Sequence, residues 1–535
     1  MDPREDCLRG GRTEPFKLHH LCAEDEEILY IDIVSLYPYV MKARTFPIGH
    51  PDVLTRDTLL LPPNNPLPWT TPEHNIYKGL LLVRVQPPNF MNGNLPPVLP
   101  YRTHDGRLTF PLCAKCADNR QQRPCTHGER ERSWLTGYTH VELNYALERG
   151  YKVVDIYEVW NYEKWDPNLF RSYVNTFIGL KQQASGWPDG CVSEMDRAAY
   201  LAEFERVEGI FLDPERIETN PEITSKLALG KLAQRVCGTE VRYAKTPAEF
   251  HQLLEDPTID MLDFDHVSEH LDRCVVRKKP EFAKAPNTNC LPVAAFVTSY
   301  ARLHLYEYIE QVNQIGGVLL YCDTDSIIYV GKRNGQRVSE GEYLGQMKRE
   351  VPSRRILEFI AGGPKNYGYR HVDASTGLDE RAELKIRSFP LSYATHQLLN
   401  FNTMKQLVLN QFNVDGAVDD TIADDVFFVG NSIGVQFPQI GRTRRSQLYT
   451  HLARKEYRPC YEKGRIMPGM ETLPFGHRMN NTQTSHGQIN QQRQTRSPIP
   501  PQQKRPRLNM NELNLQDLPG SSGWTEADYR NRYNP

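Results

Sequence analysis

The chain has 535 residues, in which 64 Lys and Arg nearly balance 66 Asp and Glu and 39% of residues are apolar, a composition typical of soluble proteins with several domains. No run approaches the roughly 20 apolar residues that a membrane helix needs, and the first residues lack the apolar core of a secretory signal, so we expect an intracellular protein without a membrane anchor. The 11 cysteines are too sparse for a disulfide scaffold, and the net charge of −2 argues against a uniformly basic nucleic-acid coat.

A strand followed by a helix is predicted at residues 27–41, EILYIDIVSLYPYVM. Its β-branched start favours a strand that ends in an acid, and Ser35 and Pro38 suit a helix start. Residues 45–140 are rich in Pro and Gly with short strand patterns, which predicts an irregular insertion carrying its own small sheet. In residues 141–239, apolar residues three or four apart predict a mostly helical block.

The second half begins with mixed short elements at 240–286, and residues 293–314 then predict a long amphipathic helix that a Gly-Gly pair ends. Residues up to about 476 mix strands and turns. The tail from about residue 480 is rich in Gln, Asn, Pro and Ser with few large apolar residues, so we expect it to be disordered.

Three aspartates stand at the ends of predicted apolar strands. Asp32 ends the first strand, and Asp323 and Asp325 lie at the tip of a hairpin predicted from the runs 318–322 and 326–330. Because an ionised carboxylate loses hydration among apolar residues, acids in such places need compensation. If these three carboxylates converge, they could hold two divalent cations about 3.5–4 Å apart, which is an arrangement suited to phosphoryl transfer. Taken alone, Asp-Thr-Asp is more typical of a polar hairpin turn.

The flanking residues favour a metal site over a polar hairpin turn. DIVSLYP at 32–38 and YCDTDS at 321–326 resemble, in the right order, the two palm-domain motifs of family B DNA polymerases. Gly-Gly-Arg at 10–12 and a Lys-x-Tyr motif at 365–367 resemble the protein-primed branch. The segments LKQQASGWP, AAFVTSYARL and ETLPFGH are similar to polymerases of self-synthesising Maverick/Polinton DNA transposons and related viruses. The resemblance extends to about residue 476 and implies an α+β right-hand fold with palm, fingers and thumb.

The resemblance also implies roles for single residues. Asp32, Asp323 and Asp325 would bind two Mg²⁺ ions and promote attack of a primer 3′ hydroxyl on a deoxynucleotide. A tyrosine under the incoming sugar would exclude the ribose 2′ hydroxyl, and lysines would contact the triphosphate as point charges. A packed core tyrosine and solvated surface lysines are the alternatives. The nucleotide-binding residues would be Tyr37, Lys181 and Lys226, and the DNA-binding residues Arg302, Lys365 and Tyr367.

Two features depart from the family. Its fingers usually carry a helix Lys-x-x-x-Asn-Ser-x-Tyr/Trp-Gly, whereas KLALGKL at 226–232 lacks about four of these residues, roughly one helical turn or 6 Å. We therefore expect weak or no polymerisation unless Lys231 and Gln234 substitute for the lost turn. The 31 residues before Asp32 are too few for the 3′ to 5′ exonuclease domain of the relatives, so no proofreading is expected.

The first insertion contains a second metal candidate. Cys113, Cys116, Cys125 and His127 form C-x2-C-x8-C-x-H, which is the ligand count of a structural zinc site. Such a site would stabilise a Pro-rich segment that has little core of its own. The short C-x-H arm is less usual than paired C-x2-C hooks, so reduced thiols beside an exposed histidine are the alternative.

Basic residues gather near the C-terminus. The run 442–465, which includes Arg444 and Arg445, alternates with tyrosines and is compatible with a thumb-like surface that contacts DNA phosphates. A solvated basic face is the alternative. Residues 504–507, Lys-Arg-Pro-Arg, match a short nuclear localisation pattern, which occurs often by chance.

The sequence thus predicts a DNA-directed DNA polymerase with primer-template DNA, deoxynucleotides and a terminal priming protein as partners. A catalytically impaired DNA-binding derivative is the alternative, because of the shortened fingers helix. The predicted regions are a palm start with the first metal-binding motif (1–44), an insertion with the zinc loop (45–140), helical fingers (141–239), a second insertion (240–286), a palm with the Asp-Thr-Asp hairpin (287–345), a thumb-like region (346–478) and a disordered tail (479–535).

Overall fold

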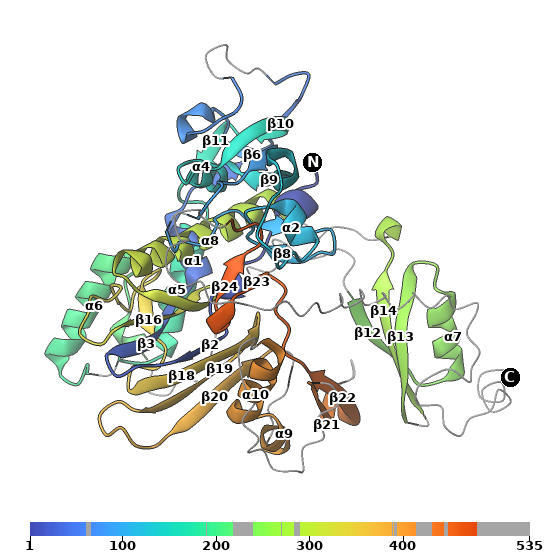
Figure 1. Cartoon of the computed structure of the whole chain (residues 1–535). Coiled ribbons are helices and arrows are strands. Elements are labelled where there is room, and N and C mark those ends of the chain that lie inside the picture. The colour runs from blue at the N-terminus through green and yellow to red at the C-terminus, as the bar shows by residue number, and fades with distance from the viewer. Residues whose placement is uncertain are drawn as a thin grey trace, which may run out of the picture. The chain divides into compact units, whose positions relative to one another are not determined.

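The chain divides into two compact units, which Figure 1 shows as a cartoon. Unit 1 comprises Met1–Gln234, Asn287–Phe437 and Ala453–Met479, and unit 2 comprises Arg235–Pro286, Pro438–Leu452 and Asn480–Pro535. Among the described helices, none is long and apolar enough to cross a membrane. The computed structural model describes residues 1–59, 66–91, 93–188, 190–217, 239–268, 270–282, 289–387, 389, 393–412, 431–442 and 448–478, so the predicted disordered tail lies outside the described residues.

Unit 1 is built on an antiparallel nine-stranded sheet. It contains the predicted hairpin, β15 (Val318–Asp323) and β16 (Ser326–Lys332), and β16 pairs with the central strand β3 (Glu26–Ile33), beside it in Figure 1. The strand order is β1-β15-β16-β3-β18-β19-β20, with β17 paired to β3 and β2 to β18. The remaining strands are β1 (Thr13–Pro15), β2 (His19–Leu21), β17 (Met347–Arg349), β18 (Arg354–Gly363), β19 (Asn366–Asp373) and β20 (Arg381–Ile386).

Strand β3 is buried on both faces, which explains its nearly continuous apolar sequence. Leu29, Ile31 and Ile33 belong to the core that α1 (Leu36–Ala43) and α8 (Leu291–Gln314) share with the sheet. Ile28 and Tyr30 face the opposite side, where Phe359, Tyr367 and Tyr369 cover them. Alternate residues of one strand therefore enter two separate cores.

Helix α8 confirms the long helix predicted at 293–314, and it lies deeper than an amphipathic surface helix. Its buried residues include polar Ser299 and Arg302, so the helix is enclosed almost all round. The chain leaves it through Gly316, which has a φ of 73°, and Gly317, where a Cβ atom would stand 2.8 Å from the Val312 side chain. The Gly-Gly stop is therefore required both by a positive φ and by close packing.

A second sheet includes strands from both sides of the predicted boundary at residue 140. Its order is β5 (Asp52–Thr55), β10 (Lys152–Asn161), β6 (Gly79–Gln86) and β9 (Trp134–Thr139), so β10 comes from the block predicted to be helical. The buried residues Val153, Ile156 and Val159 are three apart because β10 has irregularities in register at Val153/Asp155 and Ile156/Glu158. These bulges thus gave the buried residues of a strand the spacing that is typical of a helix.

The region predicted to be thumb-like, 346–478, begins with strands of the central sheet. Its first part supplies β17, β18, β19 and β20 to that sheet. Behind these strands lie α9 (Tyr393–Leu398) and α10 (Phe401–Phe412), and α10 packs against β18 in a small core with Leu18. Further along, β21 (Ile433–Arg442) pairs with β22 (Leu448–Tyr457), and β23 (Gly464–Ile466) pairs with β24 (Thr472–Pro474).

Unit 2 contains a three-stranded sheet within the predicted second insertion. The order is β12 (Thr239–Ala244), β14 (Leu271–Lys278) and β13 (Ile259–Ser268), with α7 (Pro247–Glu255) contributing Phe250 to its small core. The short helix η5 (Pro280–Phe282) also belongs to unit 2.

The remaining described elements belong to unit 1. They are η1 (Pro3–Cys7), β4 (Phe46–Ile48), η2 (Pro72–His74), β7 (Tyr101–Arg102), β8 (Leu108–Thr109), α2 (Ala114–Asp118), α3 (Glu129–Arg132), α4 (His140–Leu147), β11 (Lys164–Asp166), α5 (Arg171–Ala184), α6 (Glu194–Glu208), η3 (Pro214–Arg216) and η6 (Pro468–Met470).

Candidate active site

The three predicted aspartates gather at one end of the central strands. Ser326 at the start of β16 pairs with Asp323 on one side and with Asp32 on the other, so the two acids flank the same residue on neighbouring strands. Asp325 is in the turn, and its carbonyl oxygen accepts a 2.7 Å hydrogen bond from the Ile33 amide. The backbone pairing therefore brings the carboxylates of Asp32, Asp323 and Asp325 to one end of these strands, which we call the acidic edge of the sheet.

The hairpin tip is held in place by the Gly-Gly-Arg segment. Thr324 adopts a φ of 64°, and its amide donates a 2.7 Å hydrogen bond to the Arg12 carbonyl oxygen. A Cβ atom on Gly11 would stand 2.7 Å from the Thr324 methyl carbon, whereas one on Gly10 would meet nothing within 4 Å. Gly11 is thus needed for close approach of the backbone to the tip.

Burial and mutual repulsion perturb two of the acids. Burial, reinforced by the negative charges of Asp325 and Glu350, raises the pKa of Asp32 to about 7. The pKa of Asp325 is also raised, first by burial and then by Asp323. Like charges brought together away from water favour the protonated form, so this edge of the sheet would gain most from a bound cation.

Lys365 contacts the acidic group directly. Its ammonium donates a 2.5 Å hydrogen bond to Asp323 Oδ1, which also accepts hydrogen bonds from the hydroxyls of Thr13 (2.9 Å) and Thr324 (3.2 Å). Lys365 sits in the β18–β19 turn with a φ of 58°, and its amide donates to the Tyr321 hydroxyl at 2.6 Å. These donors fix the orientation of the Asp323 carboxylate.

Tyr367, which is predicted to contact DNA, is a buried residue. This side chain is 3% exposed, its hydroxyl lies 2.9 Å from that of Tyr30, and its ring packs on Tyr321 at 4.6 Å between centroids. Burial also raises the pKa of the Tyr367 phenol. Tyr367 belongs to the core that covers Ile28 and Tyr30, and it contacts Tyr321, two residues before Asp323.

Arg302, which is also predicted to contact DNA, is a buried residue with several partners inside the fold. Its side chain is 3% exposed and forms a two-point ion pair with Glu142 of α4, at 2.7 and 2.9 Å. The other donors reach the carbonyl oxygens of Arg9 (2.8 Å) and Gly10 (3.0 Å) and the Ser299 hydroxyl (3.0 Å). All five guanidinium N–H groups are thereby used.

The predicted nucleotide-binding residues have different positions. Tyr37, in the first turn of α1, packs partly buried against the main core, and burial raises the pKa of its phenol. Its Coulombic interaction with Asp323 and Asp325 indicates that it lies near the acidic edge. Lys181 is exposed in the last turn of α5. Lys226, with the shortened fingers motif, and Arg444 and Arg445 lie outside the described residues.

Two charged residues near Asp32, Glu350 and Lys385, were not predicted from the sequence. Glu350 raises the pKa of Asp32 and Lys385 lowers it. Lys385 Nζ also donates to the Tyr30 hydroxyl at 3.0 Å. Neither residue stands in a recognisable motif. Glu350 follows β17, which pairs with β3, and Lys385 contacts Tyr30 from β20, 355 positions later, so no local signal could have identified them.

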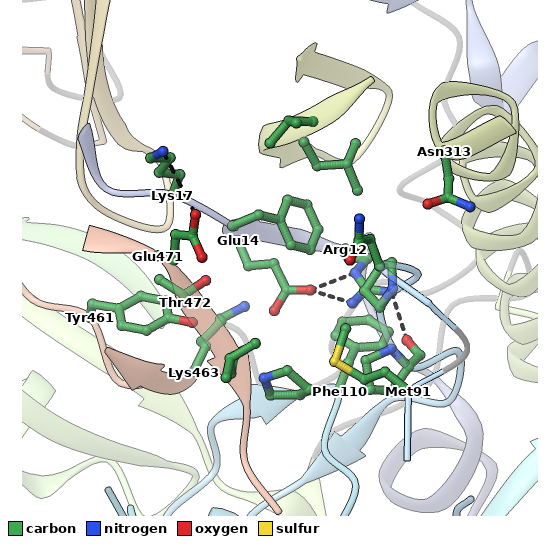
Figure 2. Close-up of a pocket in the computed structure, with 18 of the residues that line it drawn as sticks. Arg12, Glu14, Lys17, Met91, Phe110, Asn313, Tyr461, Lys463, Glu471 and Thr472 are labelled. Atoms are coloured by element: carbon green, nitrogen blue, oxygen red, sulfur yellow. Dashed lines mark hydrogen bonds and ion pairs between the residues drawn. The ribbon is translucent and has the colours of Figure 1, made fainter. Parts of the chain in front are cut away.

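A pocket of about 260 Å³ opens behind β1 and β15 (Figure 2). Arg12 and Glu14 form a buried ion pair at 2.5 Å on one wall, and Tyr461, Lys463 and Thr472 line another, as Figure 2 shows. Burial lowers the pKa of Lys463. Lys463 lay within the predicted basic run, but its position near the acidic edge was not foreseen.

The four predicted zinc ligands are also brought together. One donor atom from each of Cys113, Cys116, Cys125 and His127 lies within 4.8 Å of every other. The three cysteines are buried. His127, which the alternative interpretation takes to be exposed beside reduced thiols, is partly buried.

Comparisons with known proteins identify relatives of part of the chain. Residues 5–189 match the family model of DNA polymerase type B, organellar and viral. A probable DNA polymerase of Podospora anserina is 26% identical over 220 residues, which are 41% of this chain and 17% of that protein. Phi29 DNA polymerase in an orthorhombic crystal form has a TM-score of 0.48 at 14% identity, covering 86% of this chain and 62% of its own.

The same polymerase complexed with primer-template DNA has a TM-score of 0.47 at 14% identity, covering 85% of this chain and 61% of its own. The chain thus spans less than two thirds of each of these relatives. Its mixed helix and strand content confirms the predicted α+β class. The segment that the family model matches contains Asp32 and Tyr37, and through residues 5–189 the chain is similar to the organellar and viral type B DNA polymerases.

Proposed function

We propose that this chain is a DNA-directed DNA polymerase that extends a primer 3′ hydroxyl by two-metal phosphoryl transfer. The observation that carries the proposal is the pairing of Ser326 with both Asp323 and Asp32, which gathers three carboxylates at one sheet edge. Carboxylate oxygens are the ligands that Mg²⁺ prefers. The family match covers Asp32, the first of these acids.

The residues at this edge fit a pair of divalent ions. Buried acids with raised pKa values would be stabilised in their ionised form by bound cations. Two Mg²⁺ ions held by Asp32, Asp323 and Asp325 would supply charge neutralisation at the attacking and leaving oxygens. The hydroxyls of Thr13 and Thr324 orient Asp323 for this role. Tyr37, close to the acids, would exclude a ribose 2′ hydroxyl.

The proposed partners are primer-template DNA and deoxynucleoside triphosphates, with Lys181 and Lys226 contacting the triphosphate. Lys365 is the residue best placed to meet the primer terminus, because its ammonium already contacts Asp323. Arg444 and Arg445 would contact DNA phosphates. Initiation from a hydroxyl of a terminal protein, an origin in a self-synthesising transposon and a nuclear site of action are supported by the sequence resemblance and the short basic motif alone.

Primer extension with Mg²⁺ tests the activity. Asp325→Asn removes one proposed ligand with little change of shape, and we expect extension to fall about 100- to 1,000-fold because a charged group acting at the transition state is lost. Asp25→Asn is the matched control, since Asp25 is an exposed acid paired with Lys332 at the opposite end of the same sheet. Equal extension by Asp325→Asn and the unmodified chain would refute the metal site.

A second candidate is a DNA-binding protein that has lost catalysis, favoured by the shortened motif at 226–232. In that case the unmodified chain binds DNA in a salt-dependent manner without extending it, and Asp323→Ala and Asp325→Ala leave binding unchanged. Inserting Asn-Ser-Phe-Trp after Leu229 should then restore extension. Robust extension by the unmodified chain, equal to that of the insertion variant, would remove this candidate.

A further inference from the structure

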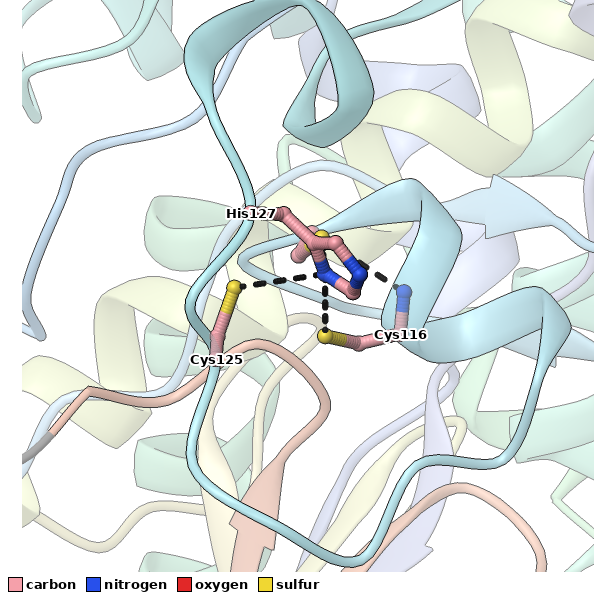
Figure 3. A group of neighbouring side chains, drawn as sticks. Cys116, Cys125 and His127 are labelled. Carbon is pink, nitrogen blue, oxygen red and sulfur yellow. Dashed lines mark hydrogen bonds between the residues drawn. The ribbon is translucent and has the colours of Figure 1, made fainter.

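The cysteine–histidine cluster has the dimensions of a ligand shell around one ion (Figure 3). The sulfur atoms of Cys113, Cys116 and Cys125 stand 3.5, 3.2 and 3.7 Å from His127 Nδ1. With Zn–S and Zn–N bonds of about 2.3 and 2.0 Å, a tetrahedral site places neighbouring donor atoms about 3.5–3.8 Å apart. The three observed sulfur–nitrogen distances scatter around the lower of these values.

Hydrogen bonding alone does not account for the same geometry. A neutral imidazole nitrogen has one lone pair, so His127 Nδ1 accepts from at most one thiol, yet three sulfur atoms surround it. The Cys116 amide also points to Cys113 Sγ at 3.5 Å, at the start of α2, which orients that sulfur toward the cluster. Three thiols and one nitrogen around a common centre are the donor set of a structural zinc site.

A segment from the far end of the chain closes over these ligands. We define residues 458–478 as the C-terminal arm. The Cys125 amide donates to the His477 carbonyl oxygen at 3.2 Å, and the Leu112 amide donates to that of Phe475 at 2.7 Å. Between them, Gly476 has a φ of 91° and approaches Cys113 so closely that a Cβ atom there would stand 2.4 Å from Cys113 Cβ. The arm therefore contacts the backbone at two of the four ligands.

The same arm reaches the acidic edge. Lys463 Nζ donates to the Thr13 carbonyl oxygen at 2.8 Å, and the Thr472 hydroxyl donates to that of Pro15 at 2.8 Å. Both acceptors belong to β1, in which Thr13 pairs with Asp323 and hydrogen-bonds its carboxylate. A continuous path of backbone and side-chain contacts thus joins the cysteine cluster to one of the three aspartates.

We propose that Cys113, Cys116, Cys125 and His127 bind one structural zinc ion, and that this ion fixes the C-terminal arm beside β1 and the Asp323 hairpin. Without zinc, the loop of residues 113–127 has few buried apolar side chains besides the cysteines themselves, so the arm would lose the surface on which Gly476 packs. This zinc is a structural ion and takes no part in nucleotide transfer.

The first measurement is the zinc content of the full chain after gel filtration with a weak chelator. We expect about one zinc ion per chain, and less than about a tenth of that in Cys113→Ser, since a closed four-ligand site binds zinc tightly. Cys191→Ser is the matched control, because Cys191 is a partly exposed free cysteine outside the cluster. Folded, zinc-free protein from cells grown with added zinc would overturn the site, as would a disulfide between Cys113 and Cys116.

The second measurement concerns the arm and needs no variant. A strong chelator should speed hydrogen exchange at the amides of Leu112, Cys125 and Thr472 by about tenfold or more, and added Zn²⁺ should restore protection. Amides of unit 2, such as those of β14, serve as an internal control. If the zinc leaves and these amides keep their protection, the arm does not depend on the ion. Neither readout requires polymerase activity, so the outcome is separate from that of primer extension.

Discussion

The buried pair of Arg302 and Glu142 distinguishes a structural arginine from a DNA contact. Arg302→Met would leave the Glu142 carboxylate, whose side chain is 1% exposed, without its cation. Breaking a buried ion pair on one side typically costs 3–5 kcal/mol, so we expect the free energy of unfolding to fall by about 4 kcal/mol. Arg302→Lys keeps the charge but cannot satisfy Glu142, Ser299 and two carbonyl oxygens together, and should cost about 2 kcal/mol.

The double variant Arg302→Met with Glu142→Leu supplies the control, because it removes the stranded charge and should recover most of the loss. Urea unfolding followed by tryptophan fluorescence measures the stability of each protein, and fluorescence anisotropy with a labelled primer-template measures binding. A surface contact to DNA would behave in the opposite way, since such substitutions change stability by about 0.5 kcal/mol or less. Normal stability of Arg302→Met together with weakened DNA binding would refute the structural assignment.

Three further substitutions have defined outcomes. Gly11→Ala should shift the hairpin tip and reduce primer extension about 100-fold, because a small displacement of catalytic groups has an effect of that size. Gly10→Ala, with open space at its Cβ, should leave extension unchanged. Equal activity of the two variants would contradict the close-approach argument. Tyr367→Phe loses the Tyr30 contact and should cost about 1 kcal/mol in urea unfolding without weakening DNA binding. Burial alone would raise the pKa of Glu358, but hydrogen bonds from His19 and Lys405 lower it to about 2. This carboxylate therefore stabilises the fold above about pH 4.5, and its contribution is lost as the pH falls toward 2. Glu358→Gln should lower the free energy of unfolding at pH 7 and reduce its further decrease between about pH 4.5 and pH 2. The same pH dependence of the free energy of unfolding in the variant and the unmodified chain would contradict this assignment.

Local sequence patterns predicted the parts of the fold whose contacts are local. The hairpin of β15 and β16, the helix start after Ser35 and the long helix α8 all follow from runs of apolar residues and their turn residues. The strand β10 was missed because its register irregularities place buried residues three apart, as in a helix. The assignment of β17 to β20 to the central sheet depends on pairing with β3, which no local pattern records.

The candidate site divides in the same way. The aspartates lie together, as the resemblance implied, because Ser326 pairs with both Asp323 and Asp32, and the cysteines and histidine meet because they are close in sequence. The burial of Arg302 and Tyr367 could not be predicted, since exposure depends on what packs against a residue. Glu142, which neutralises Arg302, lies 160 positions earlier in the chain.

The strand β1 has a consequence for how the protein reaches its active form. Thr13 pairs with Asp323, 310 positions later, and contacts Lys463, 450 positions later. Contacts of such high order form slowly, because the entropy of closing large loops is lost before the contacts contribute. During synthesis the N-terminal strand must wait for residues 318–323 and then for the arm. The acidic edge is therefore assembled only after residues 318–323 and the arm have been synthesised.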